Sequence, residues 1–197
     1  MRKDVTEIKE IVSLFLKWYD EELKRTKVRI PSAVCLSTIG VDNFPNARFV
    51  SFKEVVDNAF IITGSFTSRK GIEIAANNNV SLTFWWATTE RQIRIQGLAT
   101  KMPQQLAEKY FNKRSIYSKA VSSICEQGKE VENLELLENK IRHKVVENAK
   151  ISKPKNWGAY AITPVRVEFM EFKETRFHDR KLYEIENDIW RVKHIQP

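Results

Sequence analysis

Short runs in which apolar and polar residues alternate recur along this chain, and they restrict its fold more than any other feature. In the run RQIRIQGLAT at 91–100, two isoleucines alternate with Arg94 and Gln96. A period of two is typical of a β-strand that turns one face to a core. Similar runs bounded by turn-forming residues predict further strands at 32–39, 47–55, 59–63, 80–86, 159–164, 165–172, 175–185 and 189–195.

Helical patterns are confined to three parts of the chain. Residues 5–25, within an N-terminal segment 1–28, carry the apolar stripe of an amphipathic helix. A short helix is expected to begin near residue 68, and three more fill an inserted block at 103–150. Because strands and helices do not alternate regularly, the pattern favours an antiparallel β-barrel, mainly β with peripheral helices, over a parallel sheet. No linker is evident, so we expect 1–197 to form one domain.

The charge of the chain favours a phosphate-bearing ligand. The net charge is +8, but the basic residues are dispersed in runs of two at most. Nucleic-acid binders often carry basic tracts, so nucleic acid is a minor alternative here. No run of 18 apolar residues is present, and the charged N-terminus does not resemble a signal peptide, so we expect no contact with a membrane.

The cysteines and histidines do not indicate a metal site or a disulfide. Cys35 and Cys125 are the only cysteines and are far apart in sequence, which predicts packed thiols in a reducing cytoplasm. The three histidines lack the spacing of metal ligands, so no metal is expected.

The segment TSRKG at 67–71 places two cations in the first turn of a predicted helix. Cations are mildly unfavourable at a helix N-terminus, and a bound anion reverses that balance. Arg69 and Lys70, a hydroxyl and free backbone N–H groups would together form a phosphate cradle. Two exposed bases at a helix start fit the same residues. Arg48 and Lys53, five positions apart on strand 47–55, either contact different parts of a ligand or are partly solvated.

The helical block and one strand supply further polar candidates. Tyr110 and Arg114 are four positions apart and would share a helical face, with Ser118 one turn later. A phenol, a guanidinium and a hydroxyl suit a phosphate monoester, although a solvated helix face explains the same residues. Gln92 can offer paired amide hydrogen bonds to a heteroaromatic ring, or simply be exposed.

The stretch ETRFHDRKLY at 174–183 places Arg176, His178 and Arg180 at every second position. In an extended strand these three side chains would line one face, which predicts a cationic row suited to an anion. A solvated edge strand is the alternative.

Taken in order, these segments resemble the pyridoxine/pyridoxamine 5′-phosphate oxidase family, flavoproteins with an FMN-binding split β-barrel. The resemblance covers roughly residues 30–197. It is carried by PNARFVSFK, SRKG, RQIRIQG, KYFNKRSIYS, WGAY, VEFM, RFHDR and a C-terminal Trp and Pro. Each motif is short, but their common order makes the resemblance specific.

The resemblance implies a homodimer with FMN at the interface between its subunits. By position, it assigns cofactor contacts to Arg48, Lys53, Thr63, Gly64, Ser68, Arg69, Lys70, Gln92, Gln127, Gly128, Met170 and Arg180. It assigns the substrate phosphate to Lys53, Tyr110, Arg114 and Ser118, and the catalytic contact with the substrate pyridine to Arg176 and His178.

The implied activity is the oxidation of pyridoxamine or pyridoxine 5′-phosphate to pyridoxal 5′-phosphate, a step of vitamin B6 salvage. A hydride passes from the substrate C4′ to flavin N5, and O2 is reduced to H2O2. A sister group of the family oxidises phenazine precursors, and the retained Lys53 and phosphate cradle argue against that substrate.

The sequence also departs from the family pattern. Met170 replaces a Trp that packs near the flavin, Gly128 stands where a Ser is frequent, and Thr63 with Gly64 replaces an aromatic–Thr pair. We also expect the longer N-terminal arm of the family to be missing. These departures leave an alternative open, a split-barrel protein that binds flavin or pyridoxal phosphate with weak or no oxidase activity.

Overall fold

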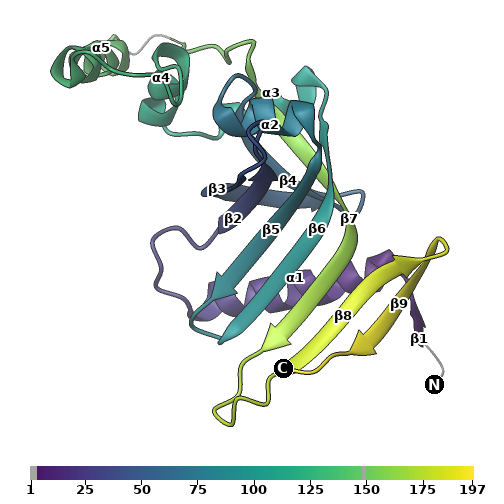
Figure 1. Ribbon diagram of the computed structural model, residues 1–197. Coiled ribbons are helices and arrows are strands. Elements are labelled where there is room, and N and C mark those ends of the chain that lie inside the picture. The colour runs from purple at the N-terminus through teal and green to yellow at the C-terminus, as the bar shows by residue number, and fades with distance from the viewer. Residues whose placement is uncertain (1–3, 148–149) are drawn as a thin grey trace.

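Six antiparallel strands close into a barrel in the computed structural model, which describes residues 4–147 and 150–197 (Figure 1). Residues 1–3 and 148–149 of the predicted helical segments lie outside the described part. The barrel order is β7-β4-β3-β2-β5-β6, and β6 pairs back to β7. The strands are β2 (Ala33–Ile39), β3 (Pro45–Val56), β4 (Ala59–Ser65), β5 (Asn79–Trp86), β6 (Arg91–Lys101) and β7 (Trp157–Glu171). The predicted antiparallel barrel with peripheral helices is confirmed.

Strand β7 is shared between the barrel and an extension of the sheet. Its first part pairs with β4 and its last part with β8 (Asp179–Glu186), while β6 accompanies it along both. Pro164 lies between the two parts, at a bulge where β7 shifts register against β6. Neither β4 nor β8 is paired opposite it, so the missing N–H of proline is tolerated. The two strands predicted at 159–164 and 165–172 are therefore one.

Two further strands extend the sheet beyond the barrel. Strand β9 (Ile189–His194) pairs with β8, and β1 (Asp4–Thr6) pairs with β9. The start of the chain was predicted to be helical from residue 5, but the first helix begins only after β1. Figure 1 shows this extension on the side of the barrel that carries both termini.

Helix α1 (Ile8–Arg25) supplies the centre of the main core. Its residue Phe15 is fully buried and meets three barrel rings edge to face. The ring centroids lie 4.8 Å from Phe60, 5.1 Å from Phe84 and 5.5 Å from Phe52. Truncating a buried Phe to Ala typically costs about 3–5 kcal/mol of unfolding free energy, so this contact fixes α1 on the barrel.

The remaining helices gather at the other end of the barrel. They are α2 (Arg69–Ala76), α3 (Gln104–Asn112), α4 (Ile116–Ile124) and α5 (Leu134–Val146). Phe111 of α3 packs against Trp157 of β7 in a second core, and α4 with α5 projects to one side (Figure 1). Within the described ranges, no helix combines the length and the apolar character needed to cross a bilayer.

Candidate functional site

A cavity of about 470 Å³ brings three cations together near the helical end of the barrel. Lys53 comes from β3, Lys70 from α2 and Arg114 from the connection between α3 and α4. The described residues that line the cavity include no Asp or Glu. Seven residues predicted from the sequence line it: Lys53, Thr63, Gly64, Lys70, Arg114, Ser118 and Gln127. The cavity therefore unites part of the predicted cofactor set with most of the predicted substrate-phosphate set.

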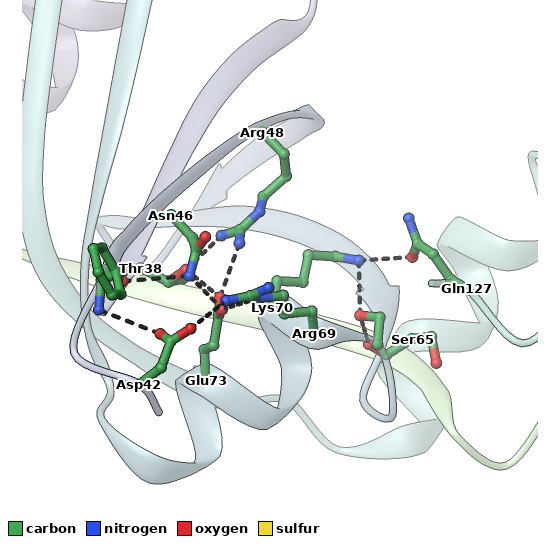
Figure 2. Close-up of polar contacts among 11 residues, drawn as sticks. Thr38, Asp42, Asn46, Arg48, Ser65, Arg69, Lys70, Glu73 and Gln127 are labelled. Atoms are coloured by element: carbon green, nitrogen blue, oxygen red, sulfur yellow. Dashed lines mark hydrogen bonds and ion pairs between the residues drawn. The ribbon is translucent and has the colours of Figure 1, made fainter. Parts of the chain in front are cut away.

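Lys70 is the most buried of these cations. Its Nζ donates to Ser68 Oγ at 3.0 Å. It also donates to Gln127 Oε1 at 2.9 Å (Figure 2). Burial, and secondarily the charge of Arg48, lowers the pKa of Lys70 to about 8. The side chain passes over Gly64, where an added Cβ would lie 2.7 Å from Lys70 Cε. An anion in the cavity would favour the charged form of this lysine.

Arg114 and Lys53 are desolvated without a neutralising partner in the cavity. Arg114 Nη2 donates to the Ser118 carbonyl and to Ser122 Oγ, each at 3.0 Å, and its guanidinium lies 5.1 Å from the Trp157 ring centroid. Its buried Nε has no hydrogen-bond partner among the described residues. Burial lowers the pKa of Arg114, and burial together with the nearby Arg114 charge lowers the pKa of Lys53. A phosphate group would satisfy both cations.

Tyr110 is placed differently from the predicted phosphate cradle. Helix α3 ends at Asn112, so Arg114 lies beyond it and the predicted shared helical face is wrong. The buried Tyr110 donates its hydroxyl to Glu54 Oε1 at 2.7 Å and does not line the cavity. Hydrogen bonds from Lys109 and Tyr110 lower the pKa of Glu54, which therefore holds the phenol as a carboxylate.

Arg48 and Arg69 lie beside the cavity and, unlike its cations, are already paired with carboxylates. Both donate to Glu73, a residue of α2 that is only 1% exposed and that sequence reasoning missed. Arg69 also donates to Asp42 at 2.9 Å (Figure 2). The spacing of Arg69 and Glu73, one helical turn apart, was the only signal in the sequence.

Gly128 explains one departure from the family pattern. It has a φ of 94°, a left-handed conformation that glycine adopts freely and other residues adopt with strain. It directly follows Gln127, which holds Lys70. A serine at this position would thus have to adopt a strained backbone.

A second group of predicted residues lies at the far end of β7. Gln92 of β6 is directly opposite Met170 of β7, and Met170 is opposite Arg180 of β8. Directly opposed residues share one face of a sheet, so these three form a cross-strand row. Arg180 donates twice to Glu168, from Nε at 2.8 Å and from Nη2 at 2.7 Å. Its charge is therefore neutralised within the chain.

The loop before β8 corrects the strand predicted at 175–185. Strand β8 begins at Asp179, so alternation does not place Arg176, His178 and Arg180 on one face. Arg176 has a φ of 65°, and its N–H closes a turn on the Lys173 carbonyl at 3.0 Å. This left-handed turn breaks the extended backbone on which the prediction depended.

His178 is held within the same loop. Its Nδ1 accepts a hydrogen bond from the Lys173 backbone N–H at 3.1 Å, and its ring lies 4.5 Å from that of Phe172. In the neutral imidazole this contact leaves the proton on Nε2. Nε2 is thus the nitrogen available to donate to a ligand.

The two groups of predicted residues lie too far apart to meet on one small ligand of one chain. Gly158 pairs with Gly64 beside the cavity, whereas Met170 belongs to the row at the other end of β7 (Figure 1). At about 3.3 Å per residue, these positions are roughly 40 Å apart along the strand. Each group can therefore supply only one side of a site.

Comparisons with known proteins cover both parts of the chain. A family model described as pyridoxamine 5′-phosphate oxidase matches residues 20–144. A second, described as the pyridoxine 5′-phosphate oxidase C-terminal dimerisation region, matches residues 157–197. Among curated relatives, the pyridoxine/pyridoxamine 5′-phosphate oxidase of Leptospira biflexa is 35% identical over 188 residues, 94% of this chain and 88% of the relative. That of Nostoc punctiforme is 33% identical over 186 residues, 93% and 86%.

Solved structures match over most of the chain as well. PhzG from Burkholderia lata 383, in complex with tetrahydrophenazine-1-carboxylic acid, has a TM-score of 0.89 and 27% identity, covering 94% of this chain and 92% of that one. A pyridoxamine 5′-phosphate oxidase-related, FMN-binding protein from Nostoc punctiforme has a TM-score of 0.74 and 16% identity, covering 92% and 96%. This second likeness concerns the fold alone.

Proposed function

The chain belongs to the pyridoxamine 5′-phosphate oxidase family, and on that premise we propose that it is an FMN-dependent oxidase of pyridoxamine and pyridoxine 5′-phosphates. The observation that carries the proposal is the cavity lined by Lys53, Lys70 and Arg114, in which no described lining residue is a carboxylate. Lys70 is buried and Arg114 is half-buried, and their hydrogen-bond partners in the cavity are neutral. Desolvated charges of this kind are costly, and a phosphate group is a ligand that offsets the cost.

The described residues fit FMN in two parts. Arg48, Ser68, Arg69, Lys70 and Gln127 would hold the phosphate and ribityl chain near the cavity. The row Gln92, Met170 and Arg180 would contact the isoalloxazine ring, with the Gln92 amide offering paired hydrogen bonds. Bound FMN would supply the hydride acceptor, and O2 would restore it with release of H2O2.

The two parts would meet in a homodimer. Because the cavity and the row lie at opposite ends of β7, the row that contacts a given FMN would come from the second copy. The match of residues 157–197 to a dimerisation region supports this arrangement, since that segment contains Met170 and Arg180. Each dimer would then contain two equivalent composite sites.

The substrate would be fixed by its phosphate at one end and by its ring at the other. Lys53, Arg114 and Ser118 would bind the phosphate, and Tyr110 would join them after its hydroxyl leaves Glu54. Arg176 and His178 of the second copy would contact the pyridine ring, with His178 donating from Nε2. Such fixation of the reacting carbon can supply about 7 kcal/mol or more of the barrier reduction.

The similarity to PhzG favours a second candidate, an oxidase of a phenazine precursor. The bound molecule of that structure carries a carboxylic acid rather than a phosphate. Three cavity cations suit a phosphate dianion better than a single carboxylate, which supports the first candidate. A flavin-binding protein with weak or no oxidase activity is the third outcome to be tested.

The visible spectrum of the purified protein separates these candidates. Flavin bands that bleach on anaerobic addition of pyridoxamine 5′-phosphate and recover in air are the expected result. Bleaching by tetrahydrophenazine-1-carboxylic acid alone would support the second candidate. A protein that keeps its flavin bands with both substrates would be a flavin-binding protein without oxidase activity. A protein that shows no flavin bands even after FMN is added would contradict the proposal.

A further inference from the structure

We propose that Glu73 is the positioning residue of the flavin-phosphate site, where its carboxylate orients the guanidiniums of Arg48 and Arg69. The inference rests on the proposed function, because it assumes that these two arginines face the FMN phosphate. It adds a residue that does not itself touch the ligand and acts through both arginines at once.

The contacts of Glu73 are all hydrogen bonds that it accepts. Oε2 accepts from Thr38 Oγ1 and from Arg48 Nη2, the latter at 2.8 Å. Oε1 accepts from Asn46 Nδ2 at 2.8 Å and from Arg69 Nε at 2.9 Å. Figure 2 shows these donors converging on the single carboxylate from β2, β3 and α2. Each oxygen thus holds one guanidinium.

The arrangement leaves donors available on both arginines. An Arg guanidinium carries five N–H groups in a rigid plane, so fixing one edge fixes the direction of the others. The described contacts of Arg48 use one N–H on Glu73 and one on Thr38, and those of Arg69 use one on Glu73 and one on Asp42. The remaining N–H groups are held in place for an anion.

The charge of Glu73 also keeps the two guanidiniums side by side. Burial raises the pKa of Glu73, but hydrogen bonds from Thr38, Arg69 and Arg48 outweigh it, so the pKa lies below its usual range. The group is therefore a carboxylate at neutral pH. Without it, two cations would face each other across a site that also contains Lys70, and their repulsion would separate them.

Asp42 provides a matched control on the same arginine. Its side chain is 48% exposed on the turn between β2 and β3, and it contacts Arg69 only through Nη2. Exposed ion pairs of this kind fix a side chain weakly, because solvent screens them. Removing this carboxylate leaves Arg69 anchored on Glu73.

The test compares Glu73→Gln with Asp42→Asn by titrating each protein with FMN and with riboflavin, which lacks the phosphate. A Gln side chain has one acceptor oxygen and one donor nitrogen, so it can anchor only one of the two guanidiniums. We expect Glu73→Gln to weaken FMN binding about tenfold, as the loss of a charged hydrogen-bond anchor implies, and to leave riboflavin binding unchanged. Asp42→Asn should bind both flavins as the wild type does.

Several outcomes would overturn the proposal. Unchanged FMN affinity in Glu73→Gln would do so, and equal weakening of FMN and riboflavin would show general damage rather than loss of positioning. If Glu73→Gln does not fold, Thr38→Val removes the hydroxyl that bonds both Glu73 and Arg48 and should weaken FMN binding selectively.

A failure of the proposed function would look different. If the wild type binds no flavin, calorimetric titration with inorganic phosphate tests Glu73 alone. Weaker phosphate binding in Glu73→Gln than in Asp42→Asn would then support the positioning role while the flavin function fails. Equal phosphate binding in the two variants, or none in the wild type, would overturn both.

Discussion

The two ends of strand β7 differ in how their charges are satisfied. At the cavity end, Lys53, Lys70 and Arg114 are desolvated, and the described residues around them offer hydroxyls, amides and a carbonyl rather than carboxylates. At the other end, Arg180 donates two hydrogen bonds to Glu168, beside Met170 and Gln92. One end therefore presents cations without carboxylate partners, whereas the other presents a neutralised row with an apolar centre.

On the proposed function, this difference corresponds to a division of labour within one composite site. The cavity end is suited to the phosphates of a cofactor and a substrate, and the row with its neighbouring loop is suited to flat rings. At about 3.3 Å per residue, the length of β7 separates the two ends within one chain. On the proposed function, two copies of the chain combine one end each.

The largest expected effect is at the loop beside the row. Replacing Arg176 or His178 by Ala should lower turnover by about 10²-fold or more, because positioned proton donors contribute on that order. Bound flavin should remain as in the wild type, since on the proposed function the FMN phosphate binds at the cavity end. Steady-state kinetics and the flavin-to-protein ratio check both statements.

Phe177→Ala is the control for this loop. Phe177 lies between the two residues and is 76% exposed, so its loss should change neither quantity. Equal loss of flavin in the Arg176 and His178 variants would contradict the division between the two ends.

The next effect concerns the substrate phosphate. Lys53→Met or Arg114→Met should raise KM for pyridoxamine 5′-phosphate by roughly tenfold to a hundredfold, the range expected for loss of one charged hydrogen bond. Lys109→Met is the matched control, because Lys109 pairs with Glu54 and does not line the cavity. An unchanged KM in both cavity variants would contradict the assignment of the substrate phosphate to the cavity.

A pH effect of intermediate size follows from Lys70. Its pKa is lowered to about 8 by burial and by Arg48, and a bound phosphate would raise it again by favouring the ammonium form. FMN binding should then be fully supported below that pH and weaken by about tenfold per pH unit above it, until the pKa of the bound state is reached. Dissociation constants measured from about pH 7 upward, above the second phosphate pKa of about 6, check this slope.

Lys70→Arg is the control for the pH effect, because a guanidinium stays charged over this range. Its FMN affinity should show no such slope above pH 8. The same slope in both proteins would assign the titration to another group.

The smallest effect is expected at the row. Met170→Trp should tighten flavin binding by a few-fold, since an aromatic pair adds about 0.5–1.5 kcal/mol beyond the area it buries. Flavin fluorescence titration measures the change. Weaker binding of both FMN and riboflavin would indicate that this row does not face the ring.

The sequence predicted the barrel well because its strands carry strong local patterns. The run at 91–100 alternates regularly and is part of β6, and the short turn at Asp57 and Asn58 joins β3 and β4 as a hairpin. The loop at 174–178 could not be predicted, because its shape depends on the left-handed Arg176 and on a hydrogen bond between His178 and the Lys173 backbone.

The candidate site was predicted in part. The resemblance singled out Lys53, Lys70 and Arg114, and the fold brings them into one cavity. The role of Glu73 depends on tertiary contacts with β2 and β3, which a helix with ordinary spacing does not reveal. The sequence also did not reveal that α3 ends at Asn112, before Arg114. The assigned roles of all these residues stay predictions.

The most direct test of the composite site is complementation in mixed dimers. Differently tagged chains carrying Arg114→Met and His178→Ala are co-expressed, and the dimer with both tags is purified. If each site takes its cavity from one copy and its loop from the other, one site carries both changes and the other carries none. The account predicts a kcat/KM about half that of the wild type, although each variant alone is impaired in kcat/KM. A mixed dimer no more active than the mean of the two variants would contradict it.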